Sequence, residues 1–170
     1  VNEAFTAQFR REATDDEIQQ IYADKAEIFM SISRTNPMPF AKEVLTALQA
    51  AGKKIVLVTG SGQKSLISRL NESYPGVFSP ENMVTSFDVK YGKPNPEPYL
   101  MALQKAGVRP NEAVVIENAP LGVQAGVEAE IFTIALNTGI LNDDVLSSAG
   151  ANVVLPSMQT LYDHLSSLLR

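Results

Sequence analysis

The spacing of hydrophobic residues changes from one part of this 170-residue chain to the next. Over residues 16–33, apolar side chains recur at three- and four-residue steps between charged ones, which predicts an amphipathic helix. Thr14 and Glu17 have the spacing of a capping box at the start of this helix. The segment Asn36-Pro37-Met38-Pro39 ends the pattern, because a residue that precedes proline avoids helical geometry. We therefore predict a hinge between two domains at this segment.

From residue 40 onward, short apolar runs alternate with helical patterns. We predict helices at residues 40–51, 63–72, 96–106, 121–129 and 158–169, and strands at residues 55–58, 83–85, 113–116, 131–136 and 153–155. Gly52 and Gly107 are expected to end the first and the third of these helices. Strands that alternate with helices form βαβ units. The predicted fold class is therefore α/β, with a mainly parallel sheet and helices on both faces.

Three polar clusters follow predicted strands or lie near them, at the edge where open α/β sheets bind ligands. The first is Thr59-Gly60-Ser61-Gly62. Its glycines let the main chain approach a ligand closely, and the N-terminus of the next helix adds free N–H groups. With the hydroxyl groups of Thr59 and Ser61, this turn is a candidate phosphate site. The alternative is an ordinary glycine-rich turn in which Ser61 caps the helix.

The second cluster is Lys90-Tyr91-Gly92-Lys93-Pro94-Asn95-Pro96, in which two prolines stiffen a loop. A lysine held by such a loop can neutralise phosphate charge. The alternative is a lysine that points into solvent.

The third cluster follows the predicted strand of Val114, Val115 and Ile116, whose β-branched side chains suit a strand buried on both faces. Glu117 and Asn118 come next and carry hard oxygen donors suited to Mg²⁺. The alternative is a strand that stops at a polar turn, with Glu117 in water. Together the three clusters would place hydroxyl groups, an ammonium and a carboxylate at one sheet edge, which favours phosphoryl chemistry.

Composition narrows the function classes further. The net charge of −5 and the pI of about 4.9 argue against nucleic acid as a partner. No apolar run approaches the roughly 20 residues of a membrane span, so no membrane partner is expected. The chain contains no cysteine, which excludes thiol catalysis and fits a cytoplasmic location. Its one histidine, His164, lies near the C-terminus, and a histidine base is therefore not expected.

In their order along the chain, the three clusters resemble the second, third and fourth motifs of the haloacid dehalogenase (HAD) superfamily, and within it the β-phosphoglucomutase-like branch. Residues 56–61 resemble the second motif, whose hydroxyl residue holds the phosphate, and Thr59 stands at that position. Residues 92–96 resemble the third motif, whose lysine steadies the nucleophile and the phosphate, and Lys93 stands there. The resemblance implies a phosphate site formed by Thr59, Gly60, Ser61 and Lys93, with Thr59 and Lys93 as catalytic residues.

Residues 116–126 resemble the fourth motif, whose acidic pair helps hold Mg²⁺. Glu117 matches the first acidic position, whereas Asn118 stands where an aspartate is usual, and an amide brings no charge to a cation. Glu130 stands where the family often has glycine at a helix end, and a glutamate is expected to disfavour a left-handed cap there. The implied organisation is a Rossmann-like HAD core at residues 37–170 and the C-terminal part of the family's helical cap at residues 1–36.

One family motif has no counterpart in the chain. The nucleophile of the family lies in a D-x-D-x-T/V motif after the first core strand, and the adjacent pairs Asp15-Asp16 and Asp143-Asp144 do not match it. In the family this strand lies between the strands that match residues 55–58 and 113–116. We therefore expect a core without its first strand, in which an upstream segment, a second chain or a rearranged sheet supplies the partner.

The resemblance implies Mg²⁺-dependent phosphoryl transfer on a small phosphorylated metabolite in the intact protein, by a sugar-phosphate phosphatase or a β-phosphoglucomutase-like mutase. An aspartate would take the phosphoryl group, and Glu117 with Asn118 would hold the metal. Without the nucleophilic aspartate, this chain alone is expected to be inactive. The alternatives are a catalytically inactive HAD fragment and a module that keeps a phosphate pocket or serves in protein interaction.

Overall fold

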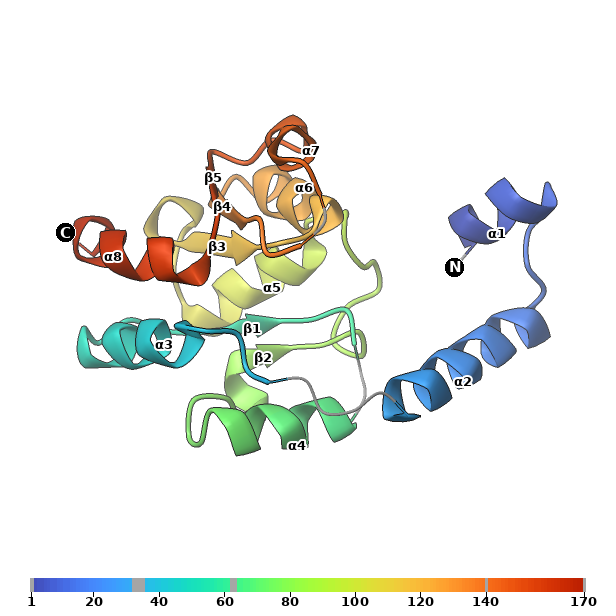
Figure 1. The fold of residues 1–170 in the computed structure, drawn as a ribbon, viewed down its shortest axis with the longest axis horizontal. Coiled ribbons are helices and arrows are strands. Elements are labelled where there is room, and N and C mark those ends of the chain that lie inside the picture. Colours follow the sequence, from blue (N-terminus) through green and yellow to red (C-terminus); the bar gives the residue numbers. More distant parts are fainter. Residues whose placement is uncertain (1, 32–35, 62–63, 140, 170) are drawn as a thin grey trace. The chain divides into compact units, whose positions relative to one another are not determined.

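The computed structural model describes residues 2–31, 36–61, 64–139 and 141–169. The chain divides into two compact units, Val1–Asn36 and Pro37–Arg170, and each is described by itself (Figure 1).

The first unit contains two helices, α1 (Asn2–Phe9) and α2 (Asp15–Ser31). The main-chain N–H of Thr14 donates to Glu17 Oε2 at 2.9 Å, and the N–H of Glu17 donates to Thr14 Oγ1 at 3.3 Å. The predicted capping box at the start of α2 is therefore confirmed. The hydrophobic pattern did not predict α1, and residues 32 and 33 of the predicted helix lie outside the described residues.

The second unit alternates helices and strands. Its helices are α3 (Ala41–Ala50), α4 (Lys64–Ser73), α5 (Glu97–Ala106), α6 (Pro120–Glu128), α7 (Asp143–Ser148) and α8 (Met158–Leu168). Its strands are β1 (Leu57–Val58), β2 (Met83–Val84), β3 (Val114–Glu117), β4 (Phe132–Leu136) and β5 (Val153–Leu155). Two 3₁₀ turns, Pro80–Asn82 and Pro110–Glu112, precede β2 and β3.

Most of these elements agree with the pattern of the sequence. All five predicted strands are present, although β1 is shorter than the predicted run of residues 55–58. Gly107 has a left-handed φ of 63° and ends α5, as expected. The sequence did not predict α7, because a helix of six residues is too short to display a helical period.

The strands form two parallel ladders in the described part of the chain, one of β1 and β2 and one of β3, β4 and β5. The central strand β4 is buried on both faces. Ile134 and Leu136 pack with Val44 of α3 and Leu161 of α8, whereas Ala135 packs with α6 and α7. The predicted α/β fold with parallel strands and helices on both faces is confirmed.

The inner edges of the two ladders have no strand partner among the described residues. The N–H of Thr59 donates to the carbonyl of Val84 in β2 at 2.8 Å. Because main-chain groups alternate in direction along a strand, the N–H and C=O of Val58 face away from β2. On β3, Val114 and Ile116 are 48% and 39% exposed, whereas the sequence predicted a strand buried on both faces. An edge strand keeps half of its main-chain groups and part of its side chains uncovered.

The helix α6 is followed by a strained residue. Glu130 has φ of 60°, so it adopts the left-handed conformation that a glutamate was expected to disfavour. The tight turn between α6 and β4 imposes this geometry, since the N–H of Glu130 donates to the carbonyl of Val127 at 2.8 Å.

We predict that Glu130→Gly stabilises the chain by about 1 kcal/mol, because glycine removes a left-handed strain that exceeds its own entropy cost. Thermal or urea unfolding measures the change. Gln124→Gly is the matched control: this exposed residue lies in the middle of α6, where glycine should destabilise by about 1 kcal/mol. A loss of stability in Glu130→Gly would contradict the prediction.

Candidate active site

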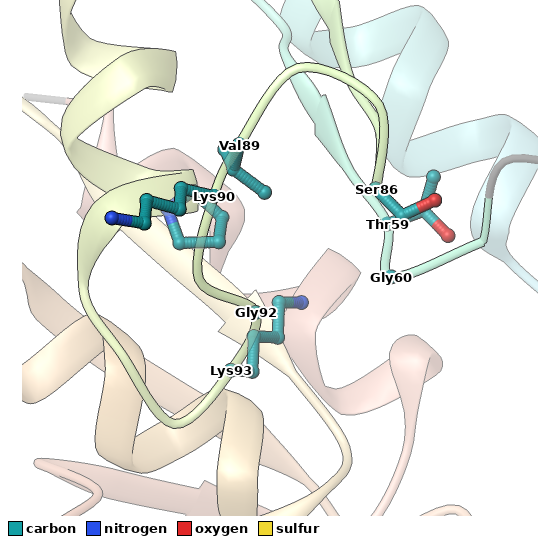
Figure 2. A pocket seen from close by; sticks show the side chains of 8 residues that line it. Thr59, Gly60, Ser86, Val89, Lys90, Gly92 and Lys93 are labelled. Atoms are coloured by element: carbon teal, nitrogen blue, oxygen red, sulfur yellow. The ribbon is translucent and has the colours of Figure 1, made fainter. Parts of the chain in front are cut away.

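A small cavity lies beside the carboxyl end of β1 and has a volume of about 110 Å³. Figure 2 shows the side chains around it, which come from the turn after β1, from the loop between β2 and α5, and from the first turn of α5. The lining residues are Thr59, Gly60, Ser86, Val89, Lys90, Gly92, Lys93 and Pro98. The first and second polar clusters of the sequence therefore share one cavity.

The turn after β1 presents a hydroxyl group and an exposed glycine to this cavity. Thr59 Oγ1 accepts a hydrogen bond from the N–H of Ser61 at 3.1 Å, which leaves the hydroxyl hydrogen of Thr59 available to a ligand. Ser61 is half-buried and does not line the cavity. Gly62 and Gln63, which the sequence also placed in this turn and in the next helix, lie outside the described residues.

The loop of the second cluster is held by carboxylate groups. Glu97 accepts hydrogen bonds from the N–H groups of Lys90 and Tyr91 at 2.9 and 2.8 Å. Asp88 accepts from both the N–H and the hydroxyl of Thr85 at 2.7 Å. These bonds hold the loop that carries Lys93.

Lys93 is not a surface lysine. Its side chain is only 17% exposed, and Nζ donates to the carbonyl of Val58 at 3.2 Å. The ammonium also forms an ion pair with Glu117, and it lies 4.9 Å from the centre of the Tyr99 ring. Figure 2 shows the amine on the side of the cavity that faces the Thr59 turn. The alternative of a solvated lysine is therefore wrong for this residue.

The third cluster joins the site through that ion pair. The Glu117 side chain is 11% exposed, so the alternative in which it points into water is also wrong. Oε1 accepts from Lys93 and from the Tyr99 hydroxyl at 3.0 Å, and Oε2 accepts from the N–H groups of Asn118 and Ala119 at 2.8 and 3.2 Å. Burial by itself would raise the pKa of Glu117, but the Lys93 ammonium and these hydrogen bonds outweigh it and lower the pKa below its usual value.

Two residues of this arrangement were not singled out from the sequence. Tyr99 lies in the first turn of α5 and contacts both Lys93 and Glu117. Gly122 lies in the first turn of α6, where a Cβ would stand 2.1 Å from the carboxyl carbon of Glu117. The available signal was spacing alone, since Tyr99 follows Lys93 by six positions and Gly122 follows Glu117 by five.

Glu117 and Asn118 provide only part of the ligand set that a hard cation such as Mg²⁺ requires. Asn118 is exposed and donates from Nδ2 to Thr138 Oγ1 at 3.2 Å, which leaves its Oδ1 as an oxygen donor. The four acceptor positions of the Glu117 carboxylate are taken, so Glu117 would have to release a donor to bind a cation. Among the described residues, no three His, Cys, Asp or Glu side chains form a cluster that could hold a metal ion. Mg²⁺ prefers six oxygen ligands. The chain's own residues do not by themselves complete such a site.

The arrangement defines an α/β protein with a hydroxyl turn and an anchored ammonium at the carboxyl end of parallel strands. A family model described as haloacid dehalogenase-like hydrolase matches residues 2–130. The chain belongs to this family of hydrolases.

Comparisons with individual proteins support the assignment of the chain to this family. The chain is 38% identical to hexitol phosphatase A of Escherichia coli over 100 residues, and 33% identical to a phosphorylated carbohydrates phosphatase of Thermotoga maritima over 138 residues. These alignments cover 59% and 78% of this chain but only 45% and 61% of the relatives. The solved structure named "Putative beta-phosphoglucomutase from Bacteroides vulgatus" superposes with a TM-score of 0.93 at 52% identity, over 99% of this chain and 68% of that one.

Among the described helices, none combines the length and the apolar character needed to cross a membrane.

Proposed function

We propose that this chain provides the phosphate site of a protein that transfers a phosphoryl group from a small phosphorylated carbohydrate, as a phosphatase or as a β-phosphoglucomutase-like mutase. The observation that carries the proposal is the shared cavity of the Thr59–Gly60 turn and the Lys93 ammonium. The names of two relatives, a hexitol phosphatase and a phosphorylated carbohydrates phosphatase, favour this substrate class.

Each residue has a distinct task in the proposal. The Thr59 hydroxyl and the N–H group of Gly60 bind phosphate oxygens, and Lys93 offsets the charge that they carry. The predicted contact of Ser61 with phosphate requires its N–H to release the bond to Thr59 Oγ1. Glu117 keeps Lys93 at the cavity by accepting its hydrogen bond. Mg²⁺ as the cofactor, with Asn118 and Glu117 as its ligands, stays a prediction; a bound Mg²⁺ would neutralise phosphate charge.

The attacking carboxylate has to reach the same cavity. Among the residues that line the cavity in the described part of the chain, none is acidic. We propose that a further parallel strand fits between β1 and β3 and ends in this carboxylate. The inner edges of β1 and β3, which have no strand partner among the described residues, the exposed Val114 and Ile116 of β3, and the greater length of the relatives support this placement. The carbonyl of Val58 already accepts from Lys93, so on Val58 the N–H is the group that would gain a partner. Each buried main-chain group that gained a partner would contribute about 1 kcal/mol.

A phosphate-binding module without turnover is the second candidate. The observation that favours it is that Thr59, Ser86, Lys90 and Lys93, the polar and charged side chains that line the cavity in the described part of the chain, include no carboxylate.

The proposal is tested with inorganic phosphate and with an aryl phosphate in the presence of Mg²⁺. We expect residues 1–170 to bind phosphate, as measured by ³¹P NMR, without hydrolysing the aryl phosphate. Turnover is expected only when an upstream apolar strand that ends in a D-x-D sequence precedes Val1.

Hydrolysis by residues 1–170 alone would overturn the need for the added strand. If neither protein binds phosphate, the proposed function is wrong. Phosphate binding without turnover in both proteins would favour the binding module.

A further inference from the structure

Tyr99 touches both members of the buried ion pair, and the proposed function assigns it no task. Its side chain is 6% exposed and comes from α5, one helical turn beyond the loop that carries Lys93. The hydroxyl donates to Glu117 Oε1 at 3.0 Å, and the ring centre lies 4.9 Å from Lys93 Nζ.

The hydroxyl of Tyr99 completes the set of donors around Glu117. A carboxylate offers about four lone-pair positions. The N–H groups of Asn118 and Ala119 occupy Oε2, while Lys93 and Tyr99 share Oε1. Each oxygen therefore accepts from two donors, and the oxygen that binds Lys93 cannot rotate away without breaking the bond from Tyr99.

The hydroxyl stays a donor over the working pH range. Burial and the neighbouring Glu117 carboxylate raise the pKa of Tyr99 far above its usual value. A neutral phenol adds no charge of its own to the cavity. It acts on the geometry of the ion pair and not on its net charge.

We propose that Tyr99 is a positioning residue, which holds the Glu117 carboxylate so that Lys93 points into the phosphate cavity. The proposal rests on the proposed function, because it assigns Lys93 to phosphate. It also gives Glu117 a task as the anchor of Lys93 that does not require contact with a cation.

A purely structural role would depend on the ring and not on the hydroxyl. The ring packs in the core with Leu103 and Val115. Tyr99→Phe keeps this packing and the contact of the ring with Lys93, and it removes only the bond to Glu117. Tyr91→Phe is the matched control, because Tyr91 is exposed in the same loop and its ring contacts Lys90.

The affinity for inorganic phosphate is measured by ³¹P NMR in four proteins: wild type, Tyr99→Phe, Glu117→Gln and the double variant. Tyr99→Phe should weaken phosphate binding about five- to tenfold, which lies within the net contribution of a single ordinary hydrogen bond. In the Glu117→Gln background the same change should alter binding less than about twofold, since Tyr99 acts through Glu117. The Nζ resonance of Lys93 in ¹⁵N spectra should shift in Tyr99→Phe and stay unchanged in Tyr91→Phe.

The outcomes separate the two proposals. If the wild type binds no phosphate, the proposed function fails and the role of Tyr99 fails with it. If the wild type binds phosphate and Tyr99→Phe binds it equally well, only the role of Tyr99 is wrong. Equal losses in both backgrounds would identify a packing effect and would also overturn it. If Tyr99→Phe does not fold, the hydroxyl proton of Tyr99 in the wild type decides: a resonance that shifts when phosphate binds supports the role, and a resonance that phosphate leaves unchanged contradicts it.

Discussion

Lys93→Met is expected to lower the turnover of the complete enzyme by at least about 10²-fold, the loss that follows removal of one charged group aimed at a transferring phosphoryl group. Methionine preserves the volume of the side chain and removes only the ammonium. The variant should also bind inorganic phosphate more weakly, because Lys93 is the cation that the structure anchors at the cavity. Steady-state kinetics with an aryl phosphate and ³¹P NMR measure the two effects.

The fold should survive this change. Glu117 keeps three of its four donors, from Tyr99, Asn118 and Ala119, so the cost should be about 1–3 kcal/mol in the free energy of unfolding. Lys54→Met is the matched control, since Lys54 also donates from Nζ to a main-chain carbonyl, that of Ala106, and does not line the cavity. Turnover within threefold of the wild type in Lys93→Met would refute the assignment of this lysine.

Gly122→Ala is expected to damage both the fold and the site through a single methyl group. The added Cβ would stand 2.1 Å from Glu117 Cδ and 2.2 Å from Oε1, closer than any real contact. Either the first turn of α6 or the carboxylate must move, which should cost about 1–3 kcal/mol of stability. A displaced carboxylate no longer holds Lys93, and a shift of about 1 Å in such a group can lower turnover by about 10²-fold.

Gly139→Ala is the control for this substitution, because a Cβ at Gly139 meets no atom within 4 Å. Thermal unfolding measures stability, and phosphate titration measures the site. An unchanged melting midpoint together with unchanged phosphate affinity in Gly122→Ala would show that Glu117 does not need its present position.

The pattern of the sequence was sufficient for the elements that depend on local periodicity. The strands β3, β4 and β5 and the helix α6 lie within a few residues of their predicted bounds, because each strand is a short run of apolar, mostly β-branched residues and α6 carries a helical pattern. The sequence also predicted the capping box of Thr14 and Glu17, because its two partners lie within one helical turn of each other.

The candidate site was predictable in part. Thr59, Lys93 and Glu117 each follow or lie near a strand of a parallel sheet, and the carboxyl ends of such strands share an edge. Their convergence is observed through the common cavity and the ion pair. What the sequence left open was whether Lys93 and Glu117 face solvent or each other, because that depends on the distance between segments 24 residues apart.

By itself, the sequence determined the α/β class, the order of the five strands and the residue types that meet at the sheet edge, since all three follow from local pattern and from the direction of parallel strands. Only the tertiary structure decided that Glu117 is saturated by four donors, that Tyr99 is one of them, that Gly122 must lack a side chain, and that the inner edges of β1 and β3 have no strand partner among the described residues. These features depend on distances of a few ångströms between segments that lie far apart in the sequence. The spacing of apolar residues along the chain does not predict such distances.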